Sequence, residues 1–235
     1  RVLRANIQFS KRLTGNTVCV TSGSVGEGKS LTIFNLAYIC ATLGERVLLV
    51  DADLHRPRQH KILEVPNTPG LANVLVGEVE LEDVVQETPD PNLTFLPSGK
   101  VASGAVHGLL DSSRMTDLIA AVKTQYDTVL FDGPPMIGVS DASVLVRDMD
   151  GVLMVVQHRK YPRSVSQRAK VMIENVGGTI LGVVLNNINI ARDYAYYYHH
   201  YYAYPKSGAV SSDTNRAPAR PTPRPCASGA GPGCG

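Results

Sequence analysis

The chain has 235 residues, a formal net charge of +2 and 43% hydrophobic residues. This length is ample to bury the core of one α/β domain, and the balanced, scattered charges argue against a nucleic-acid-binding protein. No apolar run approaches the roughly 20 residues needed to cross a bilayer, and no signal sequence opens the chain. Composition alone therefore predicts a soluble intracellular protein.

Strands and helices alternate along most of the chain. The opening RVLRANIQFS is predicted to be the latter part of a helix. Strands are predicted at residues 16–21, 46–51, 92–97, 126–132, 151–157 and 178–186, and helices at 30–43, 111–123 and 164–176. The strands are apolar nearly throughout, which is typical of a sheet covered on both faces. The predicted fold class is therefore α/β, with a mostly parallel sheet flanked by helices.

Four cysteines divide into two kinds. Cys19 and Cys40 lie in apolar runs and are predicted to be small core residues. Cys226 and Cys234 lie near the end of the chain without the spacing of metal ligands. This pattern indicates a reducing compartment.

Residues 23–30 read GSVGEGKS and satisfy the phosphate-loop pattern G-x-x-x-x-G-K-[ST] between a predicted strand and a predicted helix. Glycines let backbone N–H groups face an anion, and the helix that follows adds its positive end. Lys29 is expected to reach the phosphates of ATP, and the Ser30 hydroxyl to bind Mg²⁺. The predicted nucleotide contacts in this loop are Gly23, Ser24, Val25, Gly26, Glu27, Gly28, Lys29, Ser30 and Leu31.

Two aspartates end predicted strands, and a third follows closely. Asp51 and Asp132 would emerge at the same carboxyl edge of a parallel sheet as the phosphate loop, so we expect them to hold Mg²⁺ together with Ser30. A strand-end aspartate can also simply cap a turn. Asp53 is predicted either to orient or deprotonate an incoming hydroxyl or to contact the metal through water. With Lys29, these aspartates are the predicted catalytic residues.

The segment from Tyr194 to Tyr204 holds seven tyrosines among eleven residues. It follows neither helical nor strand periodicity, which favours an exposed terminal segment. Adjacent phenols suit interchangeable phosphate acceptors, because each phosphate adds roughly −1.5 to −2 charge and crowded phosphates repel. The alternatives are an adhesive aromatic tail, aromatic stacking on single-stranded nucleic acid and a metal site at His199 and His200. The predicted acceptors are Tyr194, Tyr196, Tyr197, Tyr198, Tyr201, Tyr202 and Tyr204.

The motifs GSVGEGKS, LLVDADLHRP and VLFDGPP together resemble the Walker A, second Walker A-like and Walker B motifs of the bacterial tyrosine kinases of exopolysaccharide and capsule assembly. The start RVLRANIQFS, the VSDA at 139–142 and the tyrosine-rich end are similar to that family in the same order. The resemblance implies a P-loop fold related to the partition and septum-positioning ATPases. It also implies MgATP as the phosphoryl donor and tyrosine as the acceptor.

Further expectations come from this resemblance. It implies a ring-like homo-oligomer in which one subunit phosphorylates its neighbour's tail. It implies activation by the cytoplasmic end of a membrane adaptor, which places the protein at the inner face of the plasma membrane through that partner or a missing upstream region. Arg1 and Arg4 match the arginines of the family's E-x-x-R-x-x-R oligomerisation helix. Asn186 falls where a residue lies near adenine, although turn formation explains it equally well.

Three positions depart from the related patterns. His55 stands where the family often has arginine, and KVASGAVHGLL replaces its Pro-Asn-Pro-like segment. Ser24 occupies the position of the second phosphate-loop lysine of partition ATPases. The predicted organisation is a kinase domain at 1–192, a tyrosine-rich tail at 193–205 and a low-complexity disordered tail at 206–235.

The function predicted from these features is an ATP-dependent protein-tyrosine kinase. It is expected to autophosphorylate its tyrosine cluster in trans and to regulate exopolysaccharide or capsule polymerisation and export. The alternative is a nucleotide-dependent assembly switch of the partition-ATPase type that transfers nothing to tyrosine. In neither case is nucleic acid an expected partner.

Overall fold

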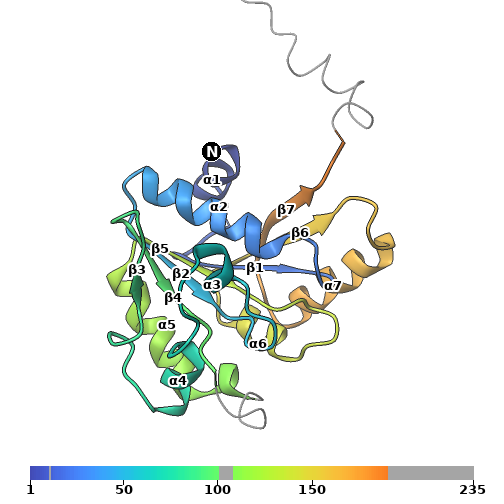
Figure 1. Ribbon diagram of the computed structural model, residues 1–235. Helices are drawn as coiled ribbons and strands as arrows, with labels where there is room; N and C mark the ends of the chain where they lie inside the picture. Colours follow the sequence, from blue (N-terminus) through green and yellow to red (C-terminus); the bar gives the residue numbers. More distant parts are fainter. Residues whose placement is uncertain (11, 101–107, 190–235) are drawn as a thin grey trace, which may run out of the picture. The chain divides into compact units, whose positions relative to one another are not determined.

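The computed structural model describes residues 1–10, 12–100 and 108–189, and Arg1–Asn189 form one compact unit. Its seven-stranded sheet has the order β3-β4-β2-β5-β1-β6-β7 (Figure 1). All neighbouring strands run parallel except β3 and β4, which confirms the predicted mostly parallel sheet. The strands are β1 (Thr17–Ser22), β2 (Val47–Asp51), β3 (Gln86–Glu87), β4 (Leu93–Leu96), β5 (Thr128–Asp132), β6 (Gly151–Gln157) and β7 (Ile180–Asn186).

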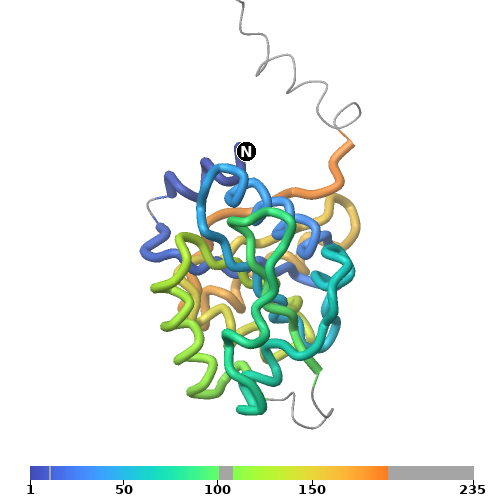
Figure 2. The backbone as a smooth tube through the Cα atoms, turned by 60° about the vertical axis from the view of Figure 1, so that its left-hand side comes forward, coloured from blue at the N-terminus to red at the C-terminus, as the bar shows by residue number. Residues whose placement is uncertain are grey.

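Helices cover both faces of this sheet. Figures 1 and 2 show α2 (blue) and α5 (yellow-green) on opposite sides, and two separate apolar clusters fill the two layers. One cluster packs the sheet against α1 and α2, and the other packs it against α4 to α7. The helices are α1 (Val2–Gln8), α2 (Lys29–Thr42), α3 (Gln59–Leu63), α4 (Leu71–Val76), α5 (Ser113–Gln125), α6 (Asp141–Arg147) and α7 (Arg163–Asn175), with a 3₁₀ turn η1 (Leu109–Asp111).

Cys19 and Cys40 illustrate why the strands and helices are apolar on their inner sides. Cys19 on β1 is fully buried in the layer beneath α4 to α7, and Cys40 on α2 is 3% exposed in the other layer. Burial raises the pKa of each thiol to about 12, so neither is a reactive thiolate at neutral pH. The prediction that both are core residues is confirmed.

Predicted helix boundaries shift where capping chemistry intervenes. The helix expected at 111–123 begins at Ser113 because Ser112 caps it, its hydroxyl accepting the Met115 N–H at 3.3 Å. Three short helices, α3, α4 and α6, have five to seven residues each. They were not predicted, because so few residues complete no clear amphipathic period.

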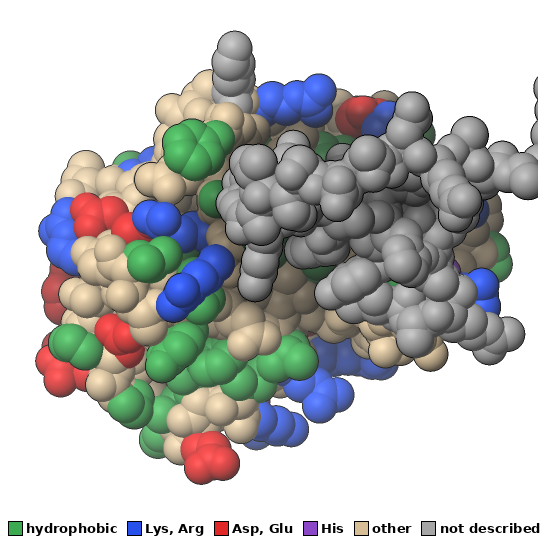
Figure 3. Space-filling model, turned by 90° about the horizontal axis from the view of Figure 1, so that it is seen from above, with side chains coloured by type: hydrophobic (Ala, Val, Ile, Leu, Met, Phe, Trp, Pro, Cys, Tyr) green, Lys and Arg blue, Asp and Glu red, His purple; other side chains and the backbone are tan. Residues whose placement is uncertain are grey.

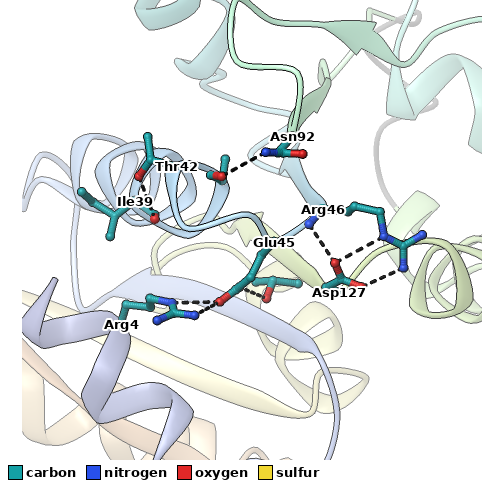
Figure 4. A network of polar contacts seen from close by, with 9 residues as sticks. Arg4, Ile39, Thr42, Glu45, Arg46, Asn92 and Asp127 are labelled. Carbon is teal, nitrogen blue, oxygen red and sulfur yellow. Dashed lines mark hydrogen bonds and ion pairs between the residues drawn. The ribbon is translucent and has the colours of Figure 1, made fainter.

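The amino edge of the sheet is tied together by a polar network (Figure 4). Arg4 on α1 donates through Nε to Glu45 Oε1 at 2.8 Å and also pairs through Nη2. The second oxygen of Glu45 accepts the Thr128 hydroxyl at 2.7 Å, and Arg46 and Asp127 pair at 2.7 Å beside it. The hydrogen bonds that Arg4 donates to Glu45 raise the pKa of Arg4 above its ordinary value. Arg4 thus fastens α1 to the sheet within its own chain.

Surface features add two observations. On the face seen from above in Figure 3, lysine and arginine side chains are interspersed with acidic and apolar ones. Among the described helices, none combines the length and hydropathy that a membrane span requires.

Candidate active site

The phosphate loop joins β1 to α2, as predicted, and two of its glycines hold left-handed backbone. Gly26 has φ of 69° and Gly28, the N-cap of α2, has φ of 93°. A Cβ on Gly28 would lie 2.0 Å from Nδ2 of Asn186. Only glycine fits both this backbone and this close approach.

Glu27 anchors the loop from inside. Its side chain is 1% exposed, and its two carboxylate oxygens accept the Ser24 N–H at 2.8 Å and the Gln157 N–H at 3.2 Å. The carboxylate is therefore committed to the protein interior, which limits any phosphate contact of Glu27 to its backbone. A buried carboxylate paired with two N–H groups holds the loop more firmly than a neutral acceptor would.

Two side chains from the turn after β6 and one from the end of β7 hold the carbonyls of the loop. Tyr161 donates to the carbonyl of Val25 at 3.0 Å, and Lys160 to that of Gly26 at 2.5 Å. Asn186 Nδ2 donates to the carbonyl of Glu27 at 3.1 Å, and its Oδ1 accepts the Asn187 N–H at 2.8 Å. Because donors already hold these carbonyls, the loop is set up to offer its N–H groups to an anion.

Asp51 and Asp132 meet at the carboxyl edge below the loop. They are register partners on the neighbouring strands β2 and β5, and both are at most 1% exposed. Asp51 Oδ2 accepts the backbone N–H groups of Arg58 at 3.0 Å and Gln59 at 2.9 Å. Asp132 Oδ2 accepts Gln59 Nε2 at 2.7 Å. Asp51 therefore caps the turn into α3 and also belongs to the convergent site.

Three buried oxygens at this point have no partner among the described residues: Oδ1 of Asp51, Oδ1 of Asp132 and Oε1 of Gln59. An unsatisfied buried acceptor costs about 1–3 kcal/mol. Desolvation by burial raises the pKa of both aspartates, and the charge of Asp132 adds to the shift at Asp51. Hydrogen bonds from Ser30 and Gln59 oppose the shift at Asp132. A cation bound here would relieve both costs.

These donors fit a hard divalent cation. Mg²⁺ is usually held by one or two carboxylates together with phosphate oxygens and water, and a hydroxyl and two strand-end carboxylates meet that demand. Within the described ranges, no three His, Cys, Asp or Glu side chains form a cluster able to hold a metal.

Asp53 lies beside this pair and is 8% exposed. Its Oδ1 accepts the Arg56 N–H at 3.0 Å, which closes a turn after β2. His55, in the same loop, contacts Asp141 through Nε2 at 2.9 Å. The VSDA segment that carries Asp141 thereby reaches the loop after β2.

The remaining predicted site residues have varied surroundings. Lys29 opens α2 and is 8% exposed, whereas Leu31 is 58% exposed on the surface of that helix. The seven predicted acceptor tyrosines lie outside the described residues. Gln59, which contacts both Asp51 and Asp132, was not predicted, because a glutamine eight positions after Asp51 matches no motif.

Comparison with known proteins agrees with this geometry. A family model described as "AAA domain" matches residues 15–179. The tyrosine-protein kinase YwqD of Bacillus subtilis is 35% identical over 200 residues, covering 84% of each chain. The crystal structure of the chimerical protein CapA2B2 has a TM-score of 0.75 at 31% identity and covers 79% of this chain and 82% of its own.

A second group of solved structures is also similar. The cell division ATPase MinD of Pyrococcus furiosus has a TM-score of 0.63 at 28% identity, covering 73% of this chain and 72% of its own. The two groups of solved structures thus share the fold of this chain. The match to YwqD covers more of both chains at higher identity, and the chain belongs to the bacterial tyrosine-protein kinase family, on an AAA-domain P-loop fold.

Proposed function

We propose that the protein transfers the γ-phosphoryl group of MgATP to tyrosine, chiefly to its own cluster between Tyr194 and Tyr204. The observation that carries this proposal is the convergence of Asp51 and Asp132, with unpartnered buried oxygens, beside the start of α2. Bound MgATP supplies an activated phosphoryl group and its charge-neutralising cation. The protein supplies positioning and electrostatic stabilisation.

Each site residue has a distinct role in this proposal. The N–H groups of the phosphate loop and the Lys29 ammonium stabilise negative charge on the phosphates. Ser30, Asp51 and Asp132 hold the metal. Asp53 receives or orients the proton of the attacking phenol, so that the phenol oxygen forms the new P–O bond as ADP leaves. No covalent enzyme intermediate is required.

Adenine recognition and assembly complete the proposal. We place Asn186 near the adenine base. Because its amide also binds the Glu27 carbonyl, Asn186 would connect the adenine end of the site, after β7, to the phosphate loop. Transfer occurs in trans within a ring-like oligomer that α1 supports. Arg4 is fixed on Glu45 in its own chain, which leaves the exposed Arg1 as the arginine able to contact a neighbour.

The setting follows from the family. We propose that the chain works at the inner face of the membrane with a membrane adaptor, in the export of a capsular or extracellular polysaccharide. Relatives named CapB and CpsD and the CapA2B2 chimera support a two-component arrangement. Successive phosphates on the tail would then loosen the oligomer by charge repulsion.

A complementation experiment tests transfer in trans. One variant, Lys29→Met, keeps the tail and loses the phosphate-binding ammonium. A second variant replaces all seven tail tyrosines by Phe and keeps the site. We expect neither to carry phosphotyrosine between residues 194 and 204 when incubated alone with MgATP. In an equimolar mixture, mass spectrometry should find phosphotyrosine on the tail of the Lys29→Met chain.

A matched control isolates the role of Lys29. Lys170→Met removes an exposed lysine of α7 that pairs with Glu174 at 3.3 Å, and tail phosphorylation should remain as in the wild type. Release of free phosphate without phosphotyrosine in the wild-type protein would instead support a nucleotide-dependent assembly switch. The likeness to MinD is the observation in favour of that second function.

A further inference from the structure

Gln59 is the first residue of α3 and is fully buried. Its side-chain amide donates from Nε2 to the carbonyl of Ser30 at 2.9 Å and to Asp132 Oδ2 at 2.7 Å. Its backbone N–H donates to Asp51 Oδ2 at 2.9 Å. One residue therefore joins the first turn of α2 to the ends of β2 and β5.

These bonds select which oxygens remain available. The amide nitrogen has two hydrogens, and both are used. Each aspartate is held through Oδ2, so that each keeps Oδ1 without a partner, as does the Gln59 amide through Oε1. The arrangement presents three acceptor oxygens from one buried cluster, which is the kind of donor set that a hydrated divalent cation binds.

Packing alone does not account for a glutamine here. A methionine has nearly the same length and would fill the same volume without leaving a buried acceptor unsatisfied. The apolar contacts of this region come from Leu63 and Val65, which pack in the cluster beneath α2. The amide of Gln59 thus serves the polar side of the site.

We propose that Gln59 is a positioning residue for the metal: it orients Asp51 and Asp132 and couples them to the phosphate loop through Ser30. This inference rests on the proposed MgATP site but assigns a role outside the three motifs. Residues that orient metal ligands typically change metal affinity or activity by about 10–100-fold when replaced.

Calorimetry with ADP tests the inference without relying on activity. Gln59→Met keeps length and volume and removes both donors. We expect its ADP affinity in EDTA to stay within twofold of the wild type, whereas the gain in affinity on adding Mg²⁺ should fall at least tenfold. In the kinase assay, the Mg²⁺ concentration for half-maximal kcat should rise, and excess Mg²⁺ should restore part of the rate. Gln86→Met, which alters a glutamine that donates to the carbonyl of Pro66, should leave every value unchanged.

Two outcomes would overturn the role of Gln59. One is wild-type Mg²⁺ dependence in Gln59→Met, and the other is an equal loss of ADP affinity with and without Mg²⁺, which marks a packing role. Wild-type protein in the same titrations separates the two proposals. If it binds ADP more tightly with Mg²⁺, the nucleotide site stands whatever Gln59→Met shows; if it does not, both proposals fail.

A second variant covers the case in which Gln59→Met does not fold. Gln59→Leu removes both donors and adds no charge. Its midpoint of thermal unfolding with ADP in EDTA should lie close to that of the wild type, and added Mg²⁺ should raise this midpoint by less than in the wild type. Identical midpoints under both conditions would rule out the positioning role.

Discussion

Asp51 and Asp132 stand side by side at the ends of β2 and β5, each with one buried oxygen that no described residue satisfies. Burial raises the pKa of both carboxylates, and the charge of Asp132 raises the pKa of Asp51 further, so the pair destabilises the ligand-free fold. Carboxylates with pKa values raised in this way are typical of functional sites. The pair therefore links the stability of the domain to occupancy of its site.

Asp51→Asn tests this link. The side-chain oxygen of Asn can still accept the N–H groups of Arg58 and Gln59, while the buried charge disappears. We expect the free energy of unfolding without nucleotide to rise by about 1–3 kcal/mol, with Mg²⁺-dependent transfer reduced at least about 100-fold. Urea unfolding and the kinase assay measure the two effects. A lower free energy of unfolding in Asp51→Asn would show that the carboxylate pair does not destabilise the ligand-free fold. Asp83→Asn, at an exposed position, serves as the control.

Asp53→Asn separates the two roles predicted for this residue. Asn can keep the turn by accepting the Arg56 N–H but cannot accept a proton. If Asp53 addresses the phenol, kcat should fall by about 10²–10⁴-fold while the KM for ATP and the Mg²⁺ requirement change less than threefold. Steady-state kinetics at varied Mg²⁺ give the answer. A raised Mg²⁺ requirement with little loss of kcat would assign Asp53 to the metal through water.

Glu27→Gln tests the interior anchor of the phosphate loop. The carboxylate accepts two backbone N–H groups, and an amide can accept only one while its NH₂ group opposes the other. We expect a loss of about 1–3 kcal/mol in the free energy of unfolding and weaker ADP binding in EDTA as well as with Mg²⁺. Glu82→Gln, at an exposed position, should change neither quantity. Unaltered ADP binding in Glu27→Gln would mean that the loop keeps its shape without this anchor.

Asp150 provides a pH-dependent contribution to stability far from the site. Its Oδ2 accepts the N–H and hydroxyl of Thr17 at 3.0 and 2.7 Å, and its Oδ1 pairs with Lys123 at 2.9 Å. Burial alone would raise the pKa of Asp150, but the bonds from Lys123 and Thr17 outweigh it and lower that pKa. The stabilisation is therefore complete above the unfolded pKa of about 4 and is lost as the pH falls through the lower folded pKa.

Asp150→Asn should accordingly reduce the free energy of unfolding by about 1.5–3 kcal/mol at pH 7. The difference from the wild type should shrink as the pH is lowered below about 4. Urea unfolding at a series of pH values measures it, again with Asp83→Asn as the control. A difference that stays constant down to the acid transition would contradict the assignment of the stabilisation to the carboxylate charge.

The sheet and its phosphate edge were predictable because their signals are local. Each signal is contained in a short stretch of sequence. These signals are apolar strands of five to seven residues, the phosphate-loop pattern at 23–30 and the aspartates at strand ends. The parallel order then brings Asp51 and Asp132 to the same edge as Lys29. This part of the fold followed from periodicity and motif context alone.

The contacts that fasten the site were not predictable in the same way. Gln59 reaches Asp132 across 73 positions of sequence, and Asn186 reaches Glu27 across 159. The sequence around each residue does not indicate that its side chain forms these hydrogen bonds, because only the fold brings the partner close. Arg4 is similar: its match to an oligomerisation motif gave no sign of its pairing with Glu45.

The placement of Asp51 and Asp132 on two interior strands also governs how the enzyme can move. Amides in β2 and β5 should exchange with solvent hydrogen only through global unfolding, because parallel neighbours hold both strands on each side. Local unfolding of the domain is therefore not expected to displace Asp51 or Asp132. We expect the motions that accompany turnover to occur in the loops at the carboxyl edge, while Asp51 and Asp132 keep their positions on the sheet.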